Sequence, residues 1–186
     1  MADQGIDKLM YSFVMEDVLK GFFIHVPPGY VAAVYDLGRG VLKKIYKPGL
    51  HLKIPFWQKA MLFNTQTLEY GITKKFNPDK PELLGDQPVT ASTKDNKKIT
   101  IEGTILLRLD PEQIPEIWQS IGEKFVEKIV RPTIQSRLRM IAAKYTLQEI
   151  SATKRADVEI SSRQELERIL YPRGIFVENV LLKEVN

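Results

Sequence analysis

The most constraining feature of the chain is a long run of alternation from Ile99 to Leu109. Apolar residues occupy every second position, with Gly103 in their register, and polar side chains fill most positions between them. Because side chains alternate between the two faces of a strand, this pattern predicts a strand with one buried face. Asp110, Pro111 and Gln113 follow at once, in the order of a helix N-cap, a first-turn proline and a capping-box residue. A long strand therefore leads directly into a helix.

The segment before this run predicts antiparallel strands. Apolar and aromatic residues cover 30–35 and 41–46, and the five residues between them include Gly38 and Gly40, which is typical of a β-hairpin. Further strands are expected at 50–54, where Pro55 ends the ladder, and at 61–67. The stretch 76–88 contains three prolines and a glycine, so we expect a surface loop there.

The segment after the run predicts helices and a closing strand. Apolar residues recur at helical spacing from 126 to 141, and Pro132 is expected to kink that helix or to start a new one. Thr146 and Glu149 form a second capping-box pattern ahead of a polar helix at 154–170, and 175–185 is expected to close the chain as a strand. Antiparallel strands, then helices, then a returning strand indicate an α+β fold.

The first residues predict an amphipathic helix. Apolar side chains between Ile6 and Phe22 recur at helical spacing and are separated by charged and polar residues. No stretch reaches the roughly 18 to 20 uninterrupted apolar residues that a membrane-spanning helix needs. A terminal helix packed on the protein's own core is at least as well supported as an interfacial anchor, because the polar face is not rich in lysine.

Positive charge is concentrated in one window of the sequence. The chain of 186 residues carries 27 Lys and Arg against 23 Asp and Glu, which gives a net charge of +4. The window from Leu37 to Leu68 has no acidic residue and carries +6, which leaves −2 for the rest. Such a window favours an anionic partner, lipid headgroups or nucleic acid, although a solvated loop face is about as well supported. Its cations are Arg39, Lys43, Lys44, Lys47, Lys53 and Lys59.

Aromatic residues lie among these cations. Phe56 and Trp57 end an apolar stretch, and Lys53 and Lys59 flank them. Amphipathic rings beside lysines are typical of a membrane interface. Each basic side chain near an anionic bilayer contributes only about 1 kcal/mol, so charge alone predicts weak, salt-sensitive attachment. Two alternatives stay open. Phe56 and Trp57 could be core residues, or the chain could be a soluble interaction module in which the basic window is a solvated face and Phe22, Phe23 and Trp57 are buried.

The sequence carries no recognisable catalytic, metal-binding or cofactor-binding motif. It has no cysteine, and its two histidines, His25 and His51, are too few to form a metal site. Gly38-Arg39-Gly40 is the G-x-G of a hairpin turn and lacks the rest of a dinucleotide-binding fingerprint. Neighbouring carboxylates fall on polar helix faces, and no nucleic-acid-binding motif is present. We therefore expect no enzyme activity, no cofactor and no nucleic-acid partner.

Four segments occur in an order that points to one family. They are V-P-P-G-Y-V-A-A-V-Y-D-L-G-R-G-V (26–41), K-P-G-L-H-L-K-I-P-F-W-Q-K (47–59), T-K-D-N (93–96) and Y-P-R-G-I-F-V-E-N-V (171–180). Together they resemble the SPFH or band 7 domain, the family of stomatins, prohibitins and flotillins. Three stretches look most like prohibitins: I-P-F-W-Q-K of the second segment, S-I-G-E-K-F (120–125) and R-P-T-I-Q-S (131–136).

The resemblance implies an α+β domain of two lobes. An N-terminal helical segment (1–21) would precede a β-rich first lobe with an antiparallel sheet (22–92), and a second lobe (93–186) would pack helices on strands. Family members usually carry an N-terminal hydrophobic anchor and a long C-terminal coiled coil, so the sequence is expected to be a fragment or a reduced form.

The resemblance also implies a non-enzymatic scaffold at a membrane, either peripheral or N-terminally anchored, that assembles into homo- or hetero-oligomeric rings. A membrane-bound AAA protease is a partner in some members. The cationic, aromatic window and the resemblance together give the site residues. They are Phe22, Phe23, Lys53, Phe56, Trp57 and Lys59 for membrane contact, Arg39, Lys43, Lys44 and Lys47 for anionic lipid, and, from the resemblance, Arg155, Glu159, Arg163 and Glu167 for contact between subunits.

Overall fold

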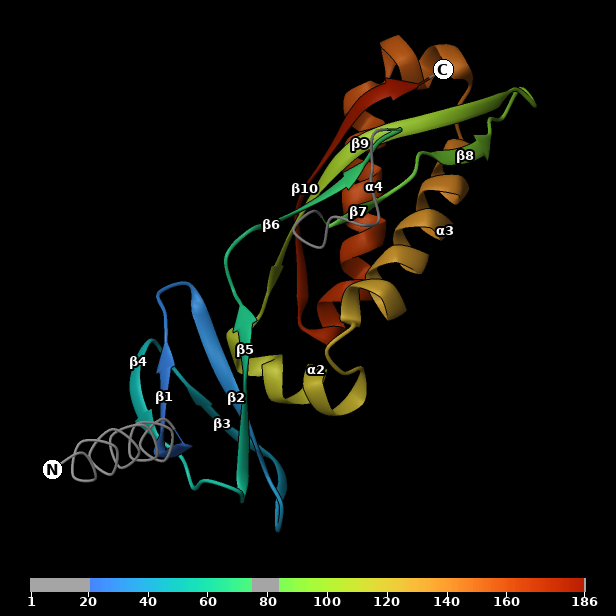
Figure 1. The fold of residues 1–186 in the computed structure, drawn as a ribbon. Helices are drawn as coiled ribbons and strands as arrows, with labels where there is room; N and C mark the ends of the chain where they lie inside the picture. The colour runs from blue at the N-terminus through green and yellow to red at the C-terminus, as the bar shows by residue number, and fades with distance from the viewer. Residues whose placement is uncertain (1–20, 75–83, 186) are drawn as a thin grey trace, which may run out of the picture.

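The computed structural model describes residues 21–74 and 84–185 and shows an elongated molecule with two sheet regions joined by a short helix (Figure 1). Most of the amphipathic helix expected between Ile6 and Phe22 and most of the loop expected at 76–88 lie outside the described residues. The α+β class is confirmed, with antiparallel sheets and helices packed on one of them.

The first sheet region contains the predicted hairpin. Strands β2 (Tyr30–Asp36), β3 (Gly40–Tyr46) and β5 (Gln58–Asn64) form an antiparallel sheet in the order β3-β2-β5, and Asp36 pairs with Gly40 at the turn. Beside it, β1 (Phe23–Val26) pairs with β4 (Gly49–Leu52). The strand expected at 50–54 ends at Leu52, and the strand expected at 61–67 begins at Gln58, because 53–57 forms a loop between them.

The second sheet contains the long strand. It runs in the order β10-β9-β6-β7, and β8 also pairs with β9; the strands are β6 (Leu68–Ile72), β7 (Gly85–Asp86), β8 (Val89–Ser92), β9 (Lys98–Leu109) and β10 (Ile175–Val185). The loop expectation is wrong for Gly85–Asp86, which pairs in parallel with β6. Strands on both sides of residue 92 pair with β9, so the change of sheet falls between β5 and β6. The predicted lobe boundary at 92 stays a prediction about domain organisation.

The helices follow β9 as expected. They are the 3₁₀ turn η1 (Pro111–Gln113), α2 (Ile114–Ser120), the π-helical η2 (Val126–Val130), α3 (Arg131–Ala142), the π-helical η3 (Glu149–Thr153), α4 (Arg155–Leu170) and the 3₁₀ turn η4 (Tyr171–Arg173). Asp110 caps η1 by accepting a hydrogen bond from the Glu112 backbone N–H, and Pro132 lies at the start of the new helix α3. Helices α3 and α4 lie side by side on one face of the second sheet (Figure 1).

One hydrophobic core connects the two sheet regions. The face of β9 predicted to be buried is buried, including Ile105 and Leu107. Phe63 of the first sheet, Ile105 of the second and Ile117 of α2 belong to the same buried cluster. Trp118 of α2 packs against this cluster and holds the helix to the first sheet, since its ring meets Tyr35 of β2 and Phe63 of β5 edge-on at centroid distances of 6.5 and 6.3 Å. The first sheet is therefore fixed to the rest of the molecule through α2.

The capping box at Thr146 is confirmed and makes part of the fold's stability pH-dependent. The Glu149 carboxylate accepts hydrogen bonds from the Lys154 ammonium (2.6 Å) and the Thr146 backbone N–H (2.9 Å). These bonds lower the pKa of Glu149 from 4.5 to about 2, and the bond from Lys154 has the largest effect. A lowered folded-state pKa means that the carboxylate stabilises the fold above pH 4.5 and that this contribution disappears as the pH falls toward 2.

We expect Glu149→Gln to lower the melting temperature at pH 7 and to lose this effect in acid. The difference in melting temperature between wild type and variant should shrink from pH 4.5 to pH 2, and thermal unfolding followed by circular dichroism measures it. A difference that stays constant over that range would contradict the assignment.

Candidate membrane interface

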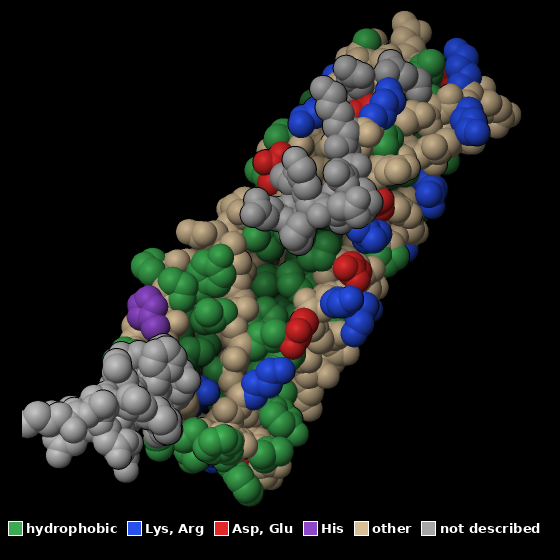
Figure 2. All heavy atoms as spheres, in the orientation of Figure 1, with side chains coloured by type: hydrophobic (Ala, Val, Ile, Leu, Met, Phe, Trp, Pro, Cys, Tyr) green, Lys and Arg blue, Asp and Glu red, His purple; other side chains and the backbone are tan. Residues whose placement is uncertain are grey.

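Large apolar side chains are exposed together at one end of the molecule. Phe56 is fully exposed, at 101%, and Trp57 is 51% exposed. The Lys53 backbone N–H donates to the Phe22 carbonyl (2.8 Å), which joins the start of β1 to the loop after β4. Figure 2 shows hydrophobic side chains gathered at this end. We call this surface the apolar tip; its members are Phe22, Phe23, Leu50, Leu52, Ile54, Phe56 and Trp57.

The loop 53–57 is closed by hydrogen bonds on both sides of Phe56. The Gln58 backbone N–H donates to the Ile54 carbonyl (2.8 Å), and the Ile54 N–H donates to Gln58 Oε1 (3.0 Å). The Leu37 N–H donates to the Trp57 carbonyl (3.0 Å), which ties the loop to the β2–β3 hairpin. Phe56 itself has a φ of 61°, in the left-handed region that side chains other than glycine adopt at a cost.

A buried carboxylate organises the hairpin beside this loop. Asp36 is 1% exposed, and its carboxylate accepts hydrogen bonds from the Gly38 and Arg39 backbone N–H groups (both 3.1 Å). Arg39 Nη2 (3.0 Å) and Gln58 Nε2 (2.9 Å) donate to its other oxygen. The hydrogen bonds from Arg39 and Gln58 hold the Asp36 pKa far below its usual range. Asp36 therefore stays ionised at neutral and mildly acidic pH.

The predicted cations lie in the same sheet region as the apolar tip but are not equivalent. Arg39 forms an ion pair with Asp36, so its charge is already partly compensated. Lys43, Lys44, Lys47 and Lys59 are exposed and Lys53 is half-buried. No carboxylate of the described residues lies within ion-pair distance of these lysines, and Asp36 is the only acidic residue in 21–68. This end of the molecule therefore carries uncompensated positive charge.

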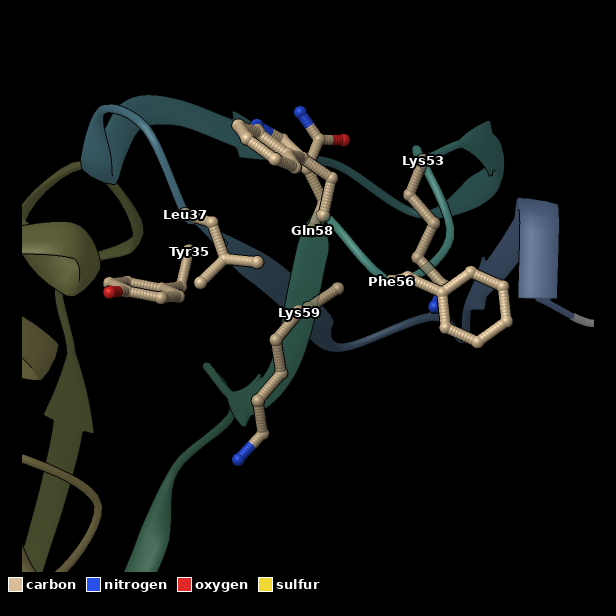
Figure 3. A pocket seen from close by; sticks show the side chains of 8 residues that line it. Tyr35, Leu37, Lys53, Phe56, Gln58 and Lys59 are labelled. Atoms are coloured by element: carbon tan, nitrogen blue, oxygen red, sulfur yellow. The ribbon is translucent and has the colours of Figure 1, made fainter.

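Lysines and aromatic rings also border a shallow hollow of about 420 Å³. Tyr35 and Leu37 lie on one side of it and Phe56 on the other, and the Phe56 ring stands clear of the backbone (Figure 3). Lys53 and Lys59 lie at its rim. An apolar group with an adjacent anion, such as a phospholipid, fits this combination of side chains.

The residues predicted for contact between subunits lie on α4, where some of them bind this chain's own strand. Arg155 donates to the Leu182 and Lys183 carbonyls of β10, and Glu159 accepts from the Leu182 N–H (2.8 Å). Arg163 and Glu167 pair with each other, with 3.4 Å between the charged atoms. Arg155 and Glu159 thus fix α4 to β10, and the predicted role of all four residues between subunits stays a prediction.

The two histidines lie on paired strands but do not converge. His51 is opposite Ile24 and His25 is opposite Leu50, which places the two rings on opposite faces of the β1–β4 ribbon. The His51 ring stacks on Tyr46, with 4.6 Å between the ring centroids. Within 21–74 and 84–185, no three potential metal-ligating side chains come together, and no helix is long and apolar enough to cross a bilayer.

Sequence reasoning missed the residues that hold the tip. Aspartate before a glycine-containing turn is a known turn signal, because its side chain accepts backbone N–H groups two or three residues ahead. That signal could have identified Asp36. Nothing local identifies Gln58, since its bond to Asp36 spans 22 residues of sequence.

Comparison with known proteins agrees with this architecture. Residues 24–186 match the SPFH domain / Band 7 family. Similar proteins include prohibitin-1 of Schizosaccharomyces pombe, 26% identical over 88% of this chain and 52% of the relative, and prohibitin 1 of Gallus gallus, 26% identical over 89% and 55%. Prohibitin-6, mitochondrial, of Arabidopsis thaliana is 25% identical over 81% and 46%. The chain thus spans about half the length of these curated relatives. By this match and its α+β fold, the chain belongs to the SPFH domain / Band 7 family.

Proposed function

We propose that the protein is a non-enzymatic, membrane-associated scaffold whose apolar tip rests on an anionic bilayer. The observation that carries the proposal is the fully exposed Phe56, which stands beside Trp57 on an end with uncompensated lysines. Exposed aromatic and aliphatic side chains lower their free energy by entering the acyl boundary, and neighbouring lysines attract the headgroups. Each contribution alone is weak, and together they give reversible attachment.

Self-assembly is the second part of the proposal. Side-by-side packing of many copies would make a weak single contact durable, because linked contacts act at a high effective concentration. The prohibitin relatives favour this scaffold role, and regulation of a membrane-bound AAA protease belongs to the same proposal. Electron microscopy of the protein on anionic vesicles tests assembly: rings support it, and dispersed particles contradict it.

A soluble protein-interaction module is the alternative function. It required Phe22, Phe23 and Trp57 to be buried, whereas all three are exposed in this chain. The exposed side chains still allow a soluble module whose tip binds an acidic protein instead of lipid. Charge reversal at the tip would then leave recovery on vesicles unchanged.

Charge reversal of Lys43 and Lys44 to glutamate is expected to lower recovery on anionic vesicles roughly tenfold or more at low salt, because each tip cation contributes about 1 kcal/mol. Flotation with anionic and with neutral vesicles measures this effect. The matched control is Lys94→Glu with Lys98→Glu, the same change of charge around the exposed β8–β9 turn at the other end of the molecule (Figure 1). Wild-type protein that stays in the soluble fraction, or equal losses in both variants, would overturn the proposed interface.

A further inference from the structure

We infer that Asp36 is a positioning residue for the membrane contact: acting through Gln58, it holds the loop 53–57 in the form that presents Phe56 and Trp57. The inference rests on the proposed function and adds how the contact is made. The tip would enter the bilayer as a preformed wedge and would not fold on binding.

The connection from Asp36 to the loop is continuous. Asp36 Oδ2 accepts from Gln58 Nε2 (2.9 Å), and Gln58 Oε1 accepts from the Ile54 backbone N–H (3.0 Å). One amide side chain thus links a buried carboxylate to the first half of the loop. The second half is held from the same hairpin, because the Leu37 N–H donates to the Trp57 carbonyl (3.0 Å).

The state of Phe56 shows why the loop needs such support. Its ring gains nothing from packing, since it is fully exposed, and its φ of 61° is unfavourable for a residue with a side chain. A residue stays in a sparsely populated conformation only when its surroundings determine that conformation. Here the surroundings are the hydrogen bonds of Gln58 and Leu37. Asp36 binds Gln58 directly, and it shapes the turn that contains Leu37 by accepting from the next two backbone N–H groups.

The negative charge of Asp36 opposes attraction between the tip and an anionic membrane. It is the only acidic residue in 21–68, and it pairs with Arg39, one of the predicted lipid-binding cations. If net charge alone set the affinity for anionic lipid, removing this carboxylate would strengthen binding. If Asp36 positions the loop, removing it weakens binding, so the two explanations predict opposite signs.

The experiment uses Asp36→Asn, which adds one positive charge to the tip and leaves every side chain of the apolar tip in place. The single oxygen of an amide at this position cannot accept all four hydrogen bonds that the carboxylate accepts, two at each oxygen, so the bonds to the turn and to Gln58 cannot all be kept. If the loop then holds the presenting conformation about a tenth of the time, the apparent affinity for anionic vesicles falls roughly tenfold. Titration with vesicles, followed by flotation, measures that affinity.

Asp95→Asn is the matched control. Asp95 lies in the β8–β9 turn and accepts hydrogen bonds from Thr93 Oγ1 (2.6 Å) and, from outside the turn, the Leu147 N–H (3.2 Å), so the variant makes the same charge change in another hydrogen-bonded turn. It should bind vesicles at least as well as wild type. Thermal unfolding of each variant confirms that the protein is folded at the assay temperature.

A second pair of variants separates positioning from general destabilisation. Gln58→Glu places two carboxylates together and should release the loop. Adding Asp36→Asn to it restores a donor and an acceptor, because an amide at position 36 can donate to a carboxylate at position 58. Binding should fall in Gln58→Glu and recover in the double variant. Acrylamide quenching of Trp57 in the free protein, in a Trp118→Phe background, should rise and recover in parallel.

The outcomes are distinct. Weaker binding by Asp36→Asn with recovery in the double variant supports the inference. Tighter or unchanged binding by Asp36→Asn, or unchanged quenching of Trp57 in Gln58→Glu, overturns it while the membrane interface stands. Wild-type protein that does not bind anionic vesicles overturns the proposed function itself.

Discussion

Gly103→Val is expected to destabilise the fold by about 3 kcal/mol or more, the largest effect of any single change considered. Gly103 lies on β9 opposite Leu182 of β10, and a Cβ at this position would lie 2.5 Å from the Leu181 carbonyl oxygen. That atom and the nearby Leu182 Cα (3.3 Å) belong to the backbone, so neither can rotate away. Strands β9 and β10 would have to separate at this point.

Thermal unfolding by circular dichroism measures this effect, and for a chain of this size the melting temperature should fall by roughly 10 °C. The matched control is Gly71→Val in β6 of the same sheet. There, the nearest atom to an added Cβ is the Leu84 carbonyl oxygen at 4.0 Å, so the change should cost far less. Similar losses in both variants would show that the close approach of β10 does not set the cost.

Gly103 also shows what the sequence could predict. Its place in the alternating run of β9 was evident, because alternation is a local pattern. The close approach of β10 was not, because those residues lie more than 70 positions further along the chain. The hairpin at Asp36–Gly40, the Asp110 cap and the Thr146–Glu149 capping box are likewise local, and each is confirmed.

Predictions that depended on contacts between residues far apart in the sequence were less accurate. Gly85–Asp86 was expected in a loop, yet it pairs with β6, where the Gly71 and Thr73 N–H groups donate to Leu84 and Asp86 carbonyls. The proline content of a segment indicates irregular local structure, but it does not show whether residues of the segment pair with a distant strand. Arg39 was grouped with the lipid-binding lysines on charge alone, and the structure pairs it with Asp36. Charge counting finds a cationic region but does not show which cations are already compensated.

The apolar tip combines both kinds of information. The sequence placed Phe56 and Trp57 beside lysines, which left burial in a core and contact with a membrane both open. The exposure of both rings removes burial in this chain's own core as the explanation. The structure adds that the exposed conformation is held at a cost in backbone strain, and such a cost persists at sites where the exposed group has a task.

Phe56→Gly should therefore separate stability from function. Glycine adopts a φ of 61° without strain, which removes about 1 to 2 kcal/mol, and its extra unfolded-state entropy costs about 0.5 to 1 kcal/mol. The melting temperature should stay the same or rise. Burial of a phenylalanine side chain contributes roughly 1.5 to 3 kcal/mol, so loss of the ring should weaken binding to anionic vesicles about tenfold or more.

Thermal unfolding and vesicle flotation of the same preparation measure the two effects. Ile160→Gly is unsuitable as a control because it would weaken α4, so the matched control is Ile160→Ala, which removes an exposed apolar side chain (50% exposed) from a helix away from the tip. It should leave binding unchanged. If Phe56→Gly binds vesicles as the wild type does, the Phe56 ring is not part of the interface. If its melting temperature is several degrees lower, the loop does not strain the residue.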